Sequence, residues 1–297
     1  MIQLIDDITA QLLPCYPEDE ARSLAWWIVE EETGLSRAQI LCGCKDTAFS
    51  PHMQINVDRL LHFEPIQYIF GHTLWNGLDL KVTPATLIPR PETAELVEKI
   101  LSTFHTASAD RKNFQLSTAH ISVLDVGTGS GCIAIALKKA HLEWQVTGID
   151  ISPEAIEVAK ENARRNNVEV AFEVADIFAN PFPLRGGCKG GFDIIVSNPP
   201  YICEREKVSM RPNVLNYEPA SALFVPDDDP LRFYRRIAEL FSLPLQGKGR
   251  ERGFLFFEIN EAYPAELSAM LDELGYTDIR ITNDIYGKPR IIEARMA

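Results

Sequence analysis

The stretch Ile121-Ser122-Val123-Leu124-Asp125-Val126-Gly127-Thr128-Gly129-Ser130-Gly131 decides the fold of this 297-residue chain. Its first six residues form a largely apolar run that predicts a buried strand, and residues 131–139 read as the helix that follows. Glycines between a strand and a helix let the backbone turn sharply and approach a ligand closely. The stretch therefore predicts the first strand, ligand-binding turn and helix of a parallel sheet.

Strand and helix patterns alternate from this stretch onward, as is typical of a parallel sheet with helices on both faces. Further strands are expected at 144–149, 168–174, 192–197 and 253–259, and helices at 153–166, 230–243 and 264–274. Residues 277–281 and 290–295 read as antiparallel strands that close the sheet. The expected fold class is α/β, with a Rossmann-like sheet of seven strands.

The chain before this sheet has two different patterns. Residues 1–70 carry helical periodicity, for example Ala21, Leu24, Ala25 and Ile28 on one face, and predict a small helical bundle. In 71–91, short apolar runs flank Asn76-Gly77, a strong hairpin signal because a type I′ turn needs positive φ at both central positions. We therefore expect a helical bundle at 1–70, a β-hairpin linker at 71–91 and the sheet domain at 92–297.

Composition and charge argue against several classes of protein. Twenty-nine basic against 42 acidic residues give a net charge of −13, which argues against affinity based on nucleic-acid phosphates. The amino terminus is acidic where a secretory signal would be positive, and no apolar run approaches the length of a membrane span. Cysteines and histidines show no metal-binding spacing. We expect a cytoplasmic protein with reduced cysteines and no metal.

Acidic residues stand at the carboxyl ends of the first three expected strands. Asp150 follows the glycine turn by roughly 20 residues, where a carboxylate accepts hydrogen bonds from ribose hydroxyls. Asp176 can accept from an adenine amine, with Ile177 packing on the ring, and Asp125 suits a cationic ligand better than a phosphate. Any one of these aspartates could instead be a helix N-cap. Together they predict a nucleoside-type ligand with a positive charge, such as the sulfonium of S-adenosylmethionine.

The tetrapeptide Asn198-Pro199-Pro200-Tyr201 follows the expected strand at 192–197. Two consecutive prolines end a strand at once, because neither can donate to a sheet ladder and each fixes its own φ. Asn198 is therefore expected at the carboxyl end of a strand, the edge where open α/β sheets bind ligands. Read alone, the tetrapeptide is a strand-ending turn. Beside the glycine turn and the aspartates, it predicts part of a ligand site.

These features resemble the class I S-adenosylmethionine-dependent methyltransferases, in which N-P-P-Y is similar to the motif of enzymes that methylate planar nitrogens. The stretches EPIQYIFG (64–71), LIPRPET (87–93) and YEP (217–219) narrow the resemblance to the peptide chain release factor protein-(glutamine-N5) methyltransferases. It covers nearly the whole chain. Three positions depart from the family pattern: Asn260 replaces a frequent glycine, Tyr263 a frequent glutamine, and Ile177 an aromatic residue of some members.

The resemblance implies an enzyme that transfers a methyl group from S-adenosylmethionine to the glutamine amide nitrogen of the Gly-Gly-Gln motif in class I release factors. The implied products are S-adenosylhomocysteine and a methylated release factor. The resemblance also implies that this methylation tunes translation termination. It also implies a release factor partner recognised by the helical bundle, with no DNA, membrane or metal, and we expect a monomer. In this reading the oxygen of Asn198 and the carbonyl of Pro199 accept the two amide hydrogens, and Tyr201 packs against the flat amide.

The candidate residues follow from the motifs and the resemblance together. The expected catalytic residues are Asn198, Pro199 and Tyr201. The expected cofactor-binding residues are Asp125, Gly127, Thr128, Gly129, Ser130, Gly131, Asp150, Ile151, Asp176, Ile177 and Asn198. The expected substrate-binding residues are Asn198, Pro199, Pro200, Tyr201, Arg90 and Glu218, of which the last two could equally form a structural ion pair.

Three other functions fit parts of the sequence less well. A methyltransferase acting on adenine or guanine in nucleic acid would use the same tetrapeptide on a flipped base, but the acidic charge disfavours it. A regulator that only binds S-adenosylmethionine would not need an intact N-P-P-Y. A nicotinamide dehydrogenase would need glycine where the chain has Cys132.

Overall fold

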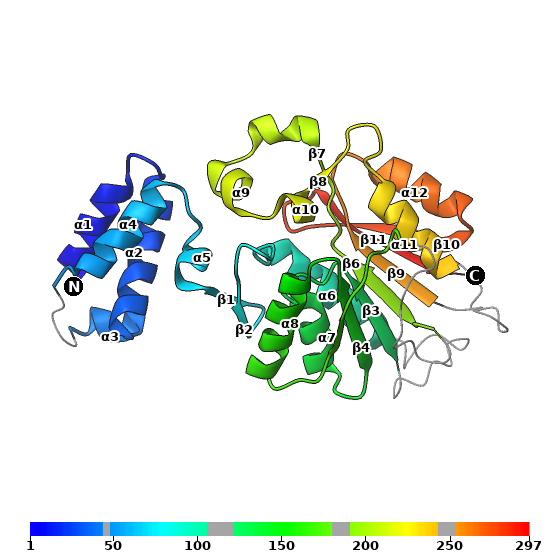
Figure 1. The fold of residues 1–297 in the computed structure, drawn as a ribbon, viewed down its shortest axis with the longest axis horizontal. Coiled ribbons are helices and arrows are strands. Elements are labelled where there is room, and N and C mark those ends of the chain that lie inside the picture. Colours follow the sequence, from blue (N-terminus) through cyan, green and yellow to red (C-terminus); the bar gives the residue numbers. More distant parts are fainter. Residues whose placement is uncertain (44–47, 106–120, 180–190, 243–252, 297) are drawn as a thin grey trace. The chain divides into compact units, whose positions relative to one another are not determined.

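The computed structural model describes residues 1–43, 48–105, 121–179, 191–242 and 253–296. These residues form two compact units (Figure 1). The helical unit comprises Met1–Gly71 together with Arg211–Tyr217, and the sheet unit comprises His72–Met210 with the chain from Glu218 onward. The hairpin expected as a linker therefore groups with the sheet, and a short segment from far downstream groups with the helical unit.

The helical unit is held by one apolar core. Its helices are α1 (Ile2–Leu12), α2 (Glu18–Thr33), α3 (Arg37–Leu41), α4 (Pro51–Leu61), α5 (Ile66–Phe70) and α9 (Pro212–Tyr217). Buried Ile5, Ile8, Ile28 and Val57 belong to this core, from helices α1, α2 and α4. The downstream segment is attached by polar contacts, an ion pair between Arg211 and Glu20 at 2.7 Å among them.

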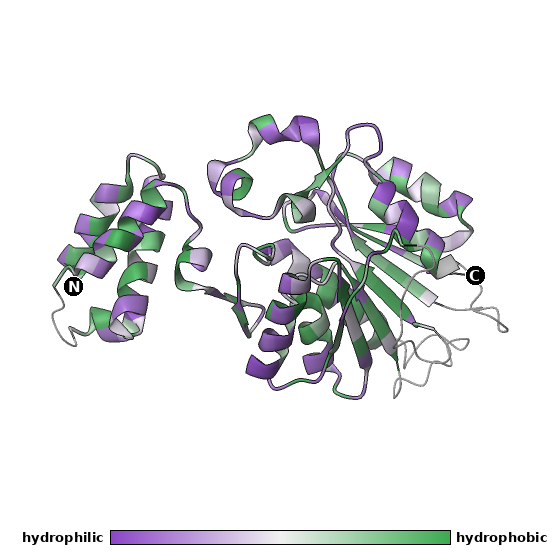
Figure 2. Ribbon diagram, viewed as in Figure 1, coloured by the Kyte–Doolittle hydropathy of each residue, from purple (hydrophilic) through white to green (hydrophobic). Residues whose placement is uncertain are grey.

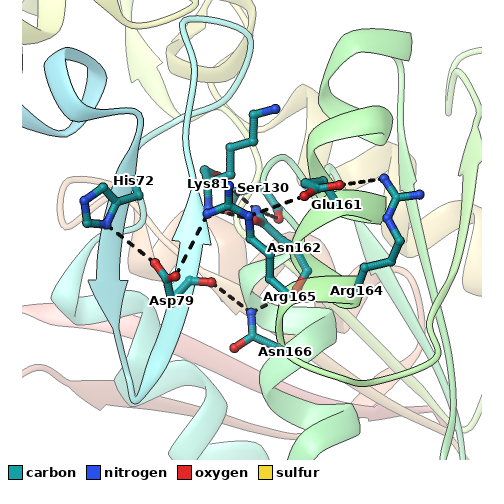
Figure 3. Close-up of polar contacts among 9 residues, drawn as sticks. All are labelled: His72, Asp79, Lys81, Ser130, Glu161, Asn162, Arg164, Arg165 and Asn166. Carbon is teal, nitrogen blue, oxygen red and sulfur yellow. Dashed lines mark hydrogen bonds and ion pairs between the residues drawn. The ribbon is translucent and has the colours of Figure 1, made fainter.

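The predicted hairpin is present. Strands β1 (His72–Trp75) and β2 (Leu78–Lys81) pair in antiparallel register, and both residues of the Asn76-Gly77 turn have positive φ. The hairpin packs on α8 (Pro153–Arg165), where Asn162 exchanges two hydrogen bonds with the backbone of Lys81 (Figure 3). Asn166 also donates to the carbonyl of Asp79. The hairpin is therefore fixed to the sheet unit by buried amide side chains.

Among the described residues, seven strands form the main sheet in the order β10-β11-β9-β6-β3-β4-β5. The bounds are β3 (Ser122–Val126), β4 (Gln145–Asp150), β5 (Ala171–Val174), β6 (Ile194–Ser197), β9 (Gly253–Glu258), β10 (Tyr276–Asn283) and β11 (Pro289–Met296). Strands β5, β4, β3, β6 and β9 are parallel, and β11 and β10 are antiparallel. The predicted α/β fold is confirmed, and the strand order reverses between β3 and β6, the position where such sheets bind ligands.

Helices cover both faces of this sheet, and the strands carry mostly hydrophobic residues (Figure 2). One face packs against α6 (Pro91–His105), α7 (Cys132–Ala140) and α8. The other face packs against α11 (Arg232–Ser242) and α12 (Pro264–Glu273). Strands buried on both faces explain the near-continuous apolar runs in the sequence.

Two local features differ from the sequence expectation. Strand β5 begins at Ala171 rather than at Val168, because the amide of Val168 donates to the carbonyl of Ala163 and so closes the end of α8. Between β6 and α11 the chain forms elements that no pattern indicated. These are β7 (Ile202–Cys203), a 3₁₀ helix (Glu204–Ser209), α9, α10 (Ala220–Leu223) and β8 (Phe224–Val225).

Candidate active site

One pocket in the sheet unit lies at the carboxyl ends of β3, β4, β5 and β6. It gathers most of the residues that the sequence predicted for the site. The predicted residues that line it are Gly127, Thr128, Gly129, Ser130, Asp150, Ile151, Asp176, Ile177, Asn198, Pro199 and Pro200. Asp125, Gly131, Tyr201, Arg90 and Glu218 do not line it, and their contacts are described below.

The glycine turn is held in place from strand β4. The amide of Thr128 donates to the carbonyl of Ile149 at 2.9 Å, and the amide of Gly129 donates to Asp150 at 2.9 Å. Gly131 lies behind the pocket with φ of +82°, and a Cβ there would come within 3.1 Å of the side chains of α7, α8 and β5. Glycine is therefore required at 131 for close packing of the helices, which fixes where the turn ends.

Asp125 holds the glycine turn through hydrogen bonds to its buried side chain. Its side chain is fully buried and accepts hydrogen bonds from the Thr128 hydroxyl at 2.6 Å and the Ala134 amide at 3.3 Å, both on Oδ2. Oδ1 is buried without a hydrogen-bond partner among the described residues. Burial raises the pKa of Asp125 to about 7. Asp125 therefore contacts the turn and the start of α7 and does not line the pocket, and its expected contact with a cationic ligand stays a prediction.

The raised pKa of Asp125 predicts a pH dependence of stability. Because the folded chain holds this proton more tightly than the unfolded chain, stability falls as pH rises between about 4 and about 7. We expect the change in melting temperature from pH 4 to pH 7 to be more favourable in Asp125→Asn than in the wild type, because only the wild type loses the contribution of Asp125 over this range. Exposed Asp228→Asn is the control and should keep the slope of the wild type. Equal slopes in all three proteins would contradict this interpretation.

The two other aspartates lie at the pocket rim. Asp150 accepts the amides of Gly129 and Ser152 on separate oxygens, and burial raises its pKa. Asp176 accepts the amide of Phe178 at 2.8 Å. Each carboxylate oxygen has more than one lone pair, so both side chains are oriented by the backbone and can still accept a bond from a ligand.

The first three residues of the tetrapeptide Asn198-Pro199-Pro200-Tyr201 line the pocket, and Tyr201 does not. Asn198 is half-buried, and its Nδ2 donates to the hydroxyl of Thr93 at 3.2 Å. Tyr201 packs against the apolar core on the α11 and α12 face, and its hydroxyl donates to Glu258 at 3.4 Å. Packing of Tyr201 on a substrate was the expectation from the resemblance. The contacts of Tyr201 among the described residues are with this core and with Glu258, and its packing on a substrate stays a prediction.

Arg90 and Glu218 form an ion pair with each other. Their atoms approach to 2.6 Å, and the Glu218 side chain is only 1% exposed. Glu218 also accepts the amide of Ile88 at 3.3 Å, and the Arg90 carbonyl accepts from the indole of Trp75. The pair joins the two chain segments that contribute Pro89 and Pro219 to the pocket wall. The geometry favours the ion-pair alternative over direct substrate contact.

Arg90→Ala would leave a buried carboxylate without its counter-ion. We expect it to lower the free energy of unfolding by about 3 kcal/mol, the usual cost of breaking a buried pair. Arg164→Ala, which removes an exposed pair with Glu161, is the matched control and should cost roughly 0.5 kcal/mol or less. Urea unfolding of both variants measures the difference. An equally small loss of unfolding free energy in both variants would show that the ion pair between Arg90 and Glu218 does not stabilise the fold.

Some residues of the site had no clear signal in the sequence. Phe178 and Phe233 line the pocket and contact edge to face, so an aromatic ring stands next to Ile177 after all. Asn162 donates to the carbonyl of Ser130 at 2.8 Å and so links the hairpin to the glycine turn (Figure 3). Thr93 lines the pocket from the first turn of α6. Only Thr93 lay inside a quoted motif.

Comparison with known proteins identifies the family. Residues 117–226 match the model of a family described as methyltransferase domain. A release factor glutamine methyltransferase of Bacteroides thetaiotaomicron is 42% identical over 97% of this chain and 97% of its own length. The chain belongs to the release factor glutamine methyltransferase family. A relative with the same name from Flavobacterium psychrophilum, 38% identical over 95% of this chain and 94% of its own length, agrees with the family predicted from the motifs.

Structural similarity supports the fold of this family member. The catalytic domain of human METTL16 in complex with an RNA hairpin matches 84% of this chain and 81% of its own, with a TM-score of 0.53 and 15% identity. At that identity the likeness concerns the fold alone. Within the described ranges, no helix is long and apolar enough to cross a membrane, and no group of three or more acidic, cysteine or histidine residues is arranged to hold a metal ion.

Proposed function

We propose that this chain transfers a methyl group from S-adenosylmethionine to the side-chain amide nitrogen of the glutamine in the Gly-Gly-Gln motif of class I release factors. Family membership supports the reaction. The observation that carries the proposal is that the glycine turn, Asp150 and Asn198-Pro199 line one pocket. The residues proposed to bind the nucleoside and the residues proposed to accept the amide hydrogens therefore line the same pocket.

The pocket residues fit S-adenosylmethionine. Asp150 is held by two backbone amides in an orientation suited to ribose hydroxyls. Ile177 and Phe178 provide an apolar surface for an adenine ring, beside the carboxylate of Asp176. Gly127 and Gly129 adopt positive φ, which keeps the turn close to the ligand without a side chain in the way. When bound, the cofactor supplies an electrophilic methyl group on its sulfonium.

Asn198 and Pro199 would orient the substrate amide. An amide nitrogen is a poor nucleophile, because its lone pair is delocalised into the carbonyl group. The Asn198 Oδ1 and the Pro199 carbonyl can each accept one amide hydrogen, which turns the remaining lone pair toward the methyl group. These hydrogen bonds strengthen as positive charge develops on the nitrogen in the transition state. Fixed orientation of this kind supplies part of the catalysis by itself.

A label-transfer assay tests the proposed function. The chain is incubated with S-adenosylmethionine labelled in its methyl group and with a class I release factor, its Gly-Gly-Ala variant, or duplex DNA. We expect label in the release factor and none in the variant or the DNA. Label in DNA, or equal label in both proteins, would contradict the proposal.

The proposal extends to recognition of the release factor. We assign this role to the helical unit, because the residues that line the proposed cofactor pocket all belong to the sheet unit. The expected monomeric state and cytoplasmic location stay predictions.

A further inference from the structure

Asn198 is connected to a buried carboxylate through one hydroxyl group. Its Nδ2 donates to the Thr93 hydroxyl at 3.2 Å, and that hydroxyl donates to Glu258 Oε2 at 2.7 Å. Thr93 and Glu258 are 2% and 1% exposed. Strand pairing explains the arrangement, because Ser197 of β6 pairs with Phe257 of β9, so the next residues, Asn198 and Glu258, lie at the same level of the sheet.

The chemistry of these three side chains determines which atom donates and which accepts in each of the two hydrogen bonds. An ionised carboxylate only accepts hydrogen bonds, so the single proton of the Thr93 hydroxyl is directed at Glu258. Toward Asn198 the hydroxyl then offers only its lone pairs, and the atom facing it must be the amide nitrogen. Because Nδ2 and Oδ1 point in different directions from the trigonal Cγ, this contact also fixes the side on which Oδ1 of Asn198 lies.

We propose that Thr93 and Glu258 are positioning residues that set the amide orientation of Asn198, so that Oδ1 faces the substrate amide. The inference rests on the proposed function, in which Oδ1 of Asn198 accepts a substrate hydrogen. A flipped Asn198 would present its NH₂ group to the substrate NH₂, and the two donors would repel. The negative charge of Glu258 also polarises Asn198 through the Thr93 hydroxyl. This makes Oδ1 a stronger acceptor when charge develops on the substrate.

The segment Glu258-Ile259-Asn260 also contacts the last residue of N-P-P-Y, Tyr201. Glu258 accepts from the Tyr201 hydroxyl, and Asn260 donates from Nδ2 to the Tyr201 carbonyl at 3.0 Å. Asn260 is one of the positions where this chain departs from the family pattern. Residues 258–260 thus contact both Asn198, through Thr93, and Tyr201.

Burial raises the pKa of Glu258 to about 6, so its charge state changes near neutral pH. A protonated Glu258 can donate to Thr93, whose own proton is then free to turn to Asn198 and favour the flipped amide. The wild-type rate should therefore fall below about pH 6. The charged and titratable groups around Glu258 are Glu92 of α6, Cys132 of α7, Tyr201, Tyr234 of α11 and Arg290 of β11.

The first experiment compares hydroxyl deletions. We expect Thr93→Val to lower kcat about tenfold, the effect of one lost hydrogen bond, while the Kd of S-adenosylhomocysteine stays unchanged. Thr93→Ser restores the hydroxyl and should recover most of the rate. Thr103→Val is the matched control, because it removes a half-buried hydroxyl that donates to the Lys99 carbonyl at 2.8 Å on the same helix, away from the pocket, and it should leave kcat unchanged.

Two further measurements separate positioning from general destabilisation. In an Asn198→Ala background, Thr93→Val should have no additional effect, because the group that it positions is gone. In Glu258→Gln, which cannot change its charge, the loss of rate below about pH 6 should disappear. The inference would be overturned by a wild-type rate in Thr93→Val or by additive effects in the double variant. It would also be overturned if Glu258→Gln lost rate below about pH 6 as the wild type does. Failure of the wild type to methylate the release factor would instead refute the proposed function.

Discussion

Asn198→Ala is expected to lower the rate of methyl transfer by about 100-fold to 1,000-fold, the usual effect of removing one oriented transition-state hydrogen bond. The loss should appear in kcat at saturating cofactor, because the proposed mechanism has Asn198 bind the reacting amide more strongly in the transition state than in the ground state. The Kd for S-adenosylhomocysteine, measured by calorimetry, should change little, since Asp150 and the glycine turn are untouched.

Asn198→Asp is the informative companion variant. Aspartate keeps an acceptor of the same shape, but it loses the Nδ2 donor and turns a carboxylate toward the Thr93 hydroxyl. It also adds a charge that attracts the sulfonium. We therefore expect tighter binding of S-adenosylmethionine than in the wild type and a rate between those of the wild type and Asn198→Ala. Full activity of folded Asn198→Ala would refute the role given to this side chain.

Asp150→Ala is expected to weaken binding of S-adenosylhomocysteine by about 100-fold, the loss of two hydrogen bonds between ribose hydroxyls and a charged acceptor. Part of the loss comes from the protein itself. The amides of Gly129 and Ser152 lose their acceptor, so the glycine turn is less well fixed before the ligand arrives. Calorimetric titration measures the affinity, and kcat at saturating cofactor should stay close to that of the wild type.

Asp150→Asn tests whether charge or shape matters. The amide keeps one acceptor oxygen but places an NH₂ group opposite one of the two backbone amides, so we expect an intermediate affinity. Wild-type affinity in Asp150→Ala would remove this residue from the cofactor site. A fall in kcat at saturating cofactor with unchanged affinity would place it in the chemical step instead.

Local patterns predicted the parts of the fold that depend on neighbouring residues. The turn at Asn76-Gly77 requires positive φ, and the hairpin formed there. The apolar runs before Gly127 and Asn198 became central strands, because strands buried on both faces need such runs. The residues at the ends of these strands then met in one pocket, since parallel strands present their carboxyl ends at one edge.

Contacts between segments that are far apart in the sequence could not be predicted from local patterns. Thr93 and Glu258 are 165 residues apart, and their hydrogen bond depends on the packing of α6 against β9. Asp125 has the right residue type for a ligand contact, but only the structure shows that its Oδ2 accepts hydrogen bonds from the turn and from α7 and that the residue does not line the pocket. Arg90 and Glu218 had two interpretations, and their separation of 2.6 Å favours one of them.

The most direct test of the proposed function is tandem mass spectrometry of a class I release factor after reaction with this chain and S-adenosylmethionine. The account predicts one added methyl group on the glutamine of the Gly-Gly-Gln peptide, located on its side-chain amide nitrogen, and no methyl group there when Asn198→Ala replaces the wild type under the same brief reaction. An unmodified glutamine after reaction with the wild type, or a methyl group found only at another residue, would contradict it.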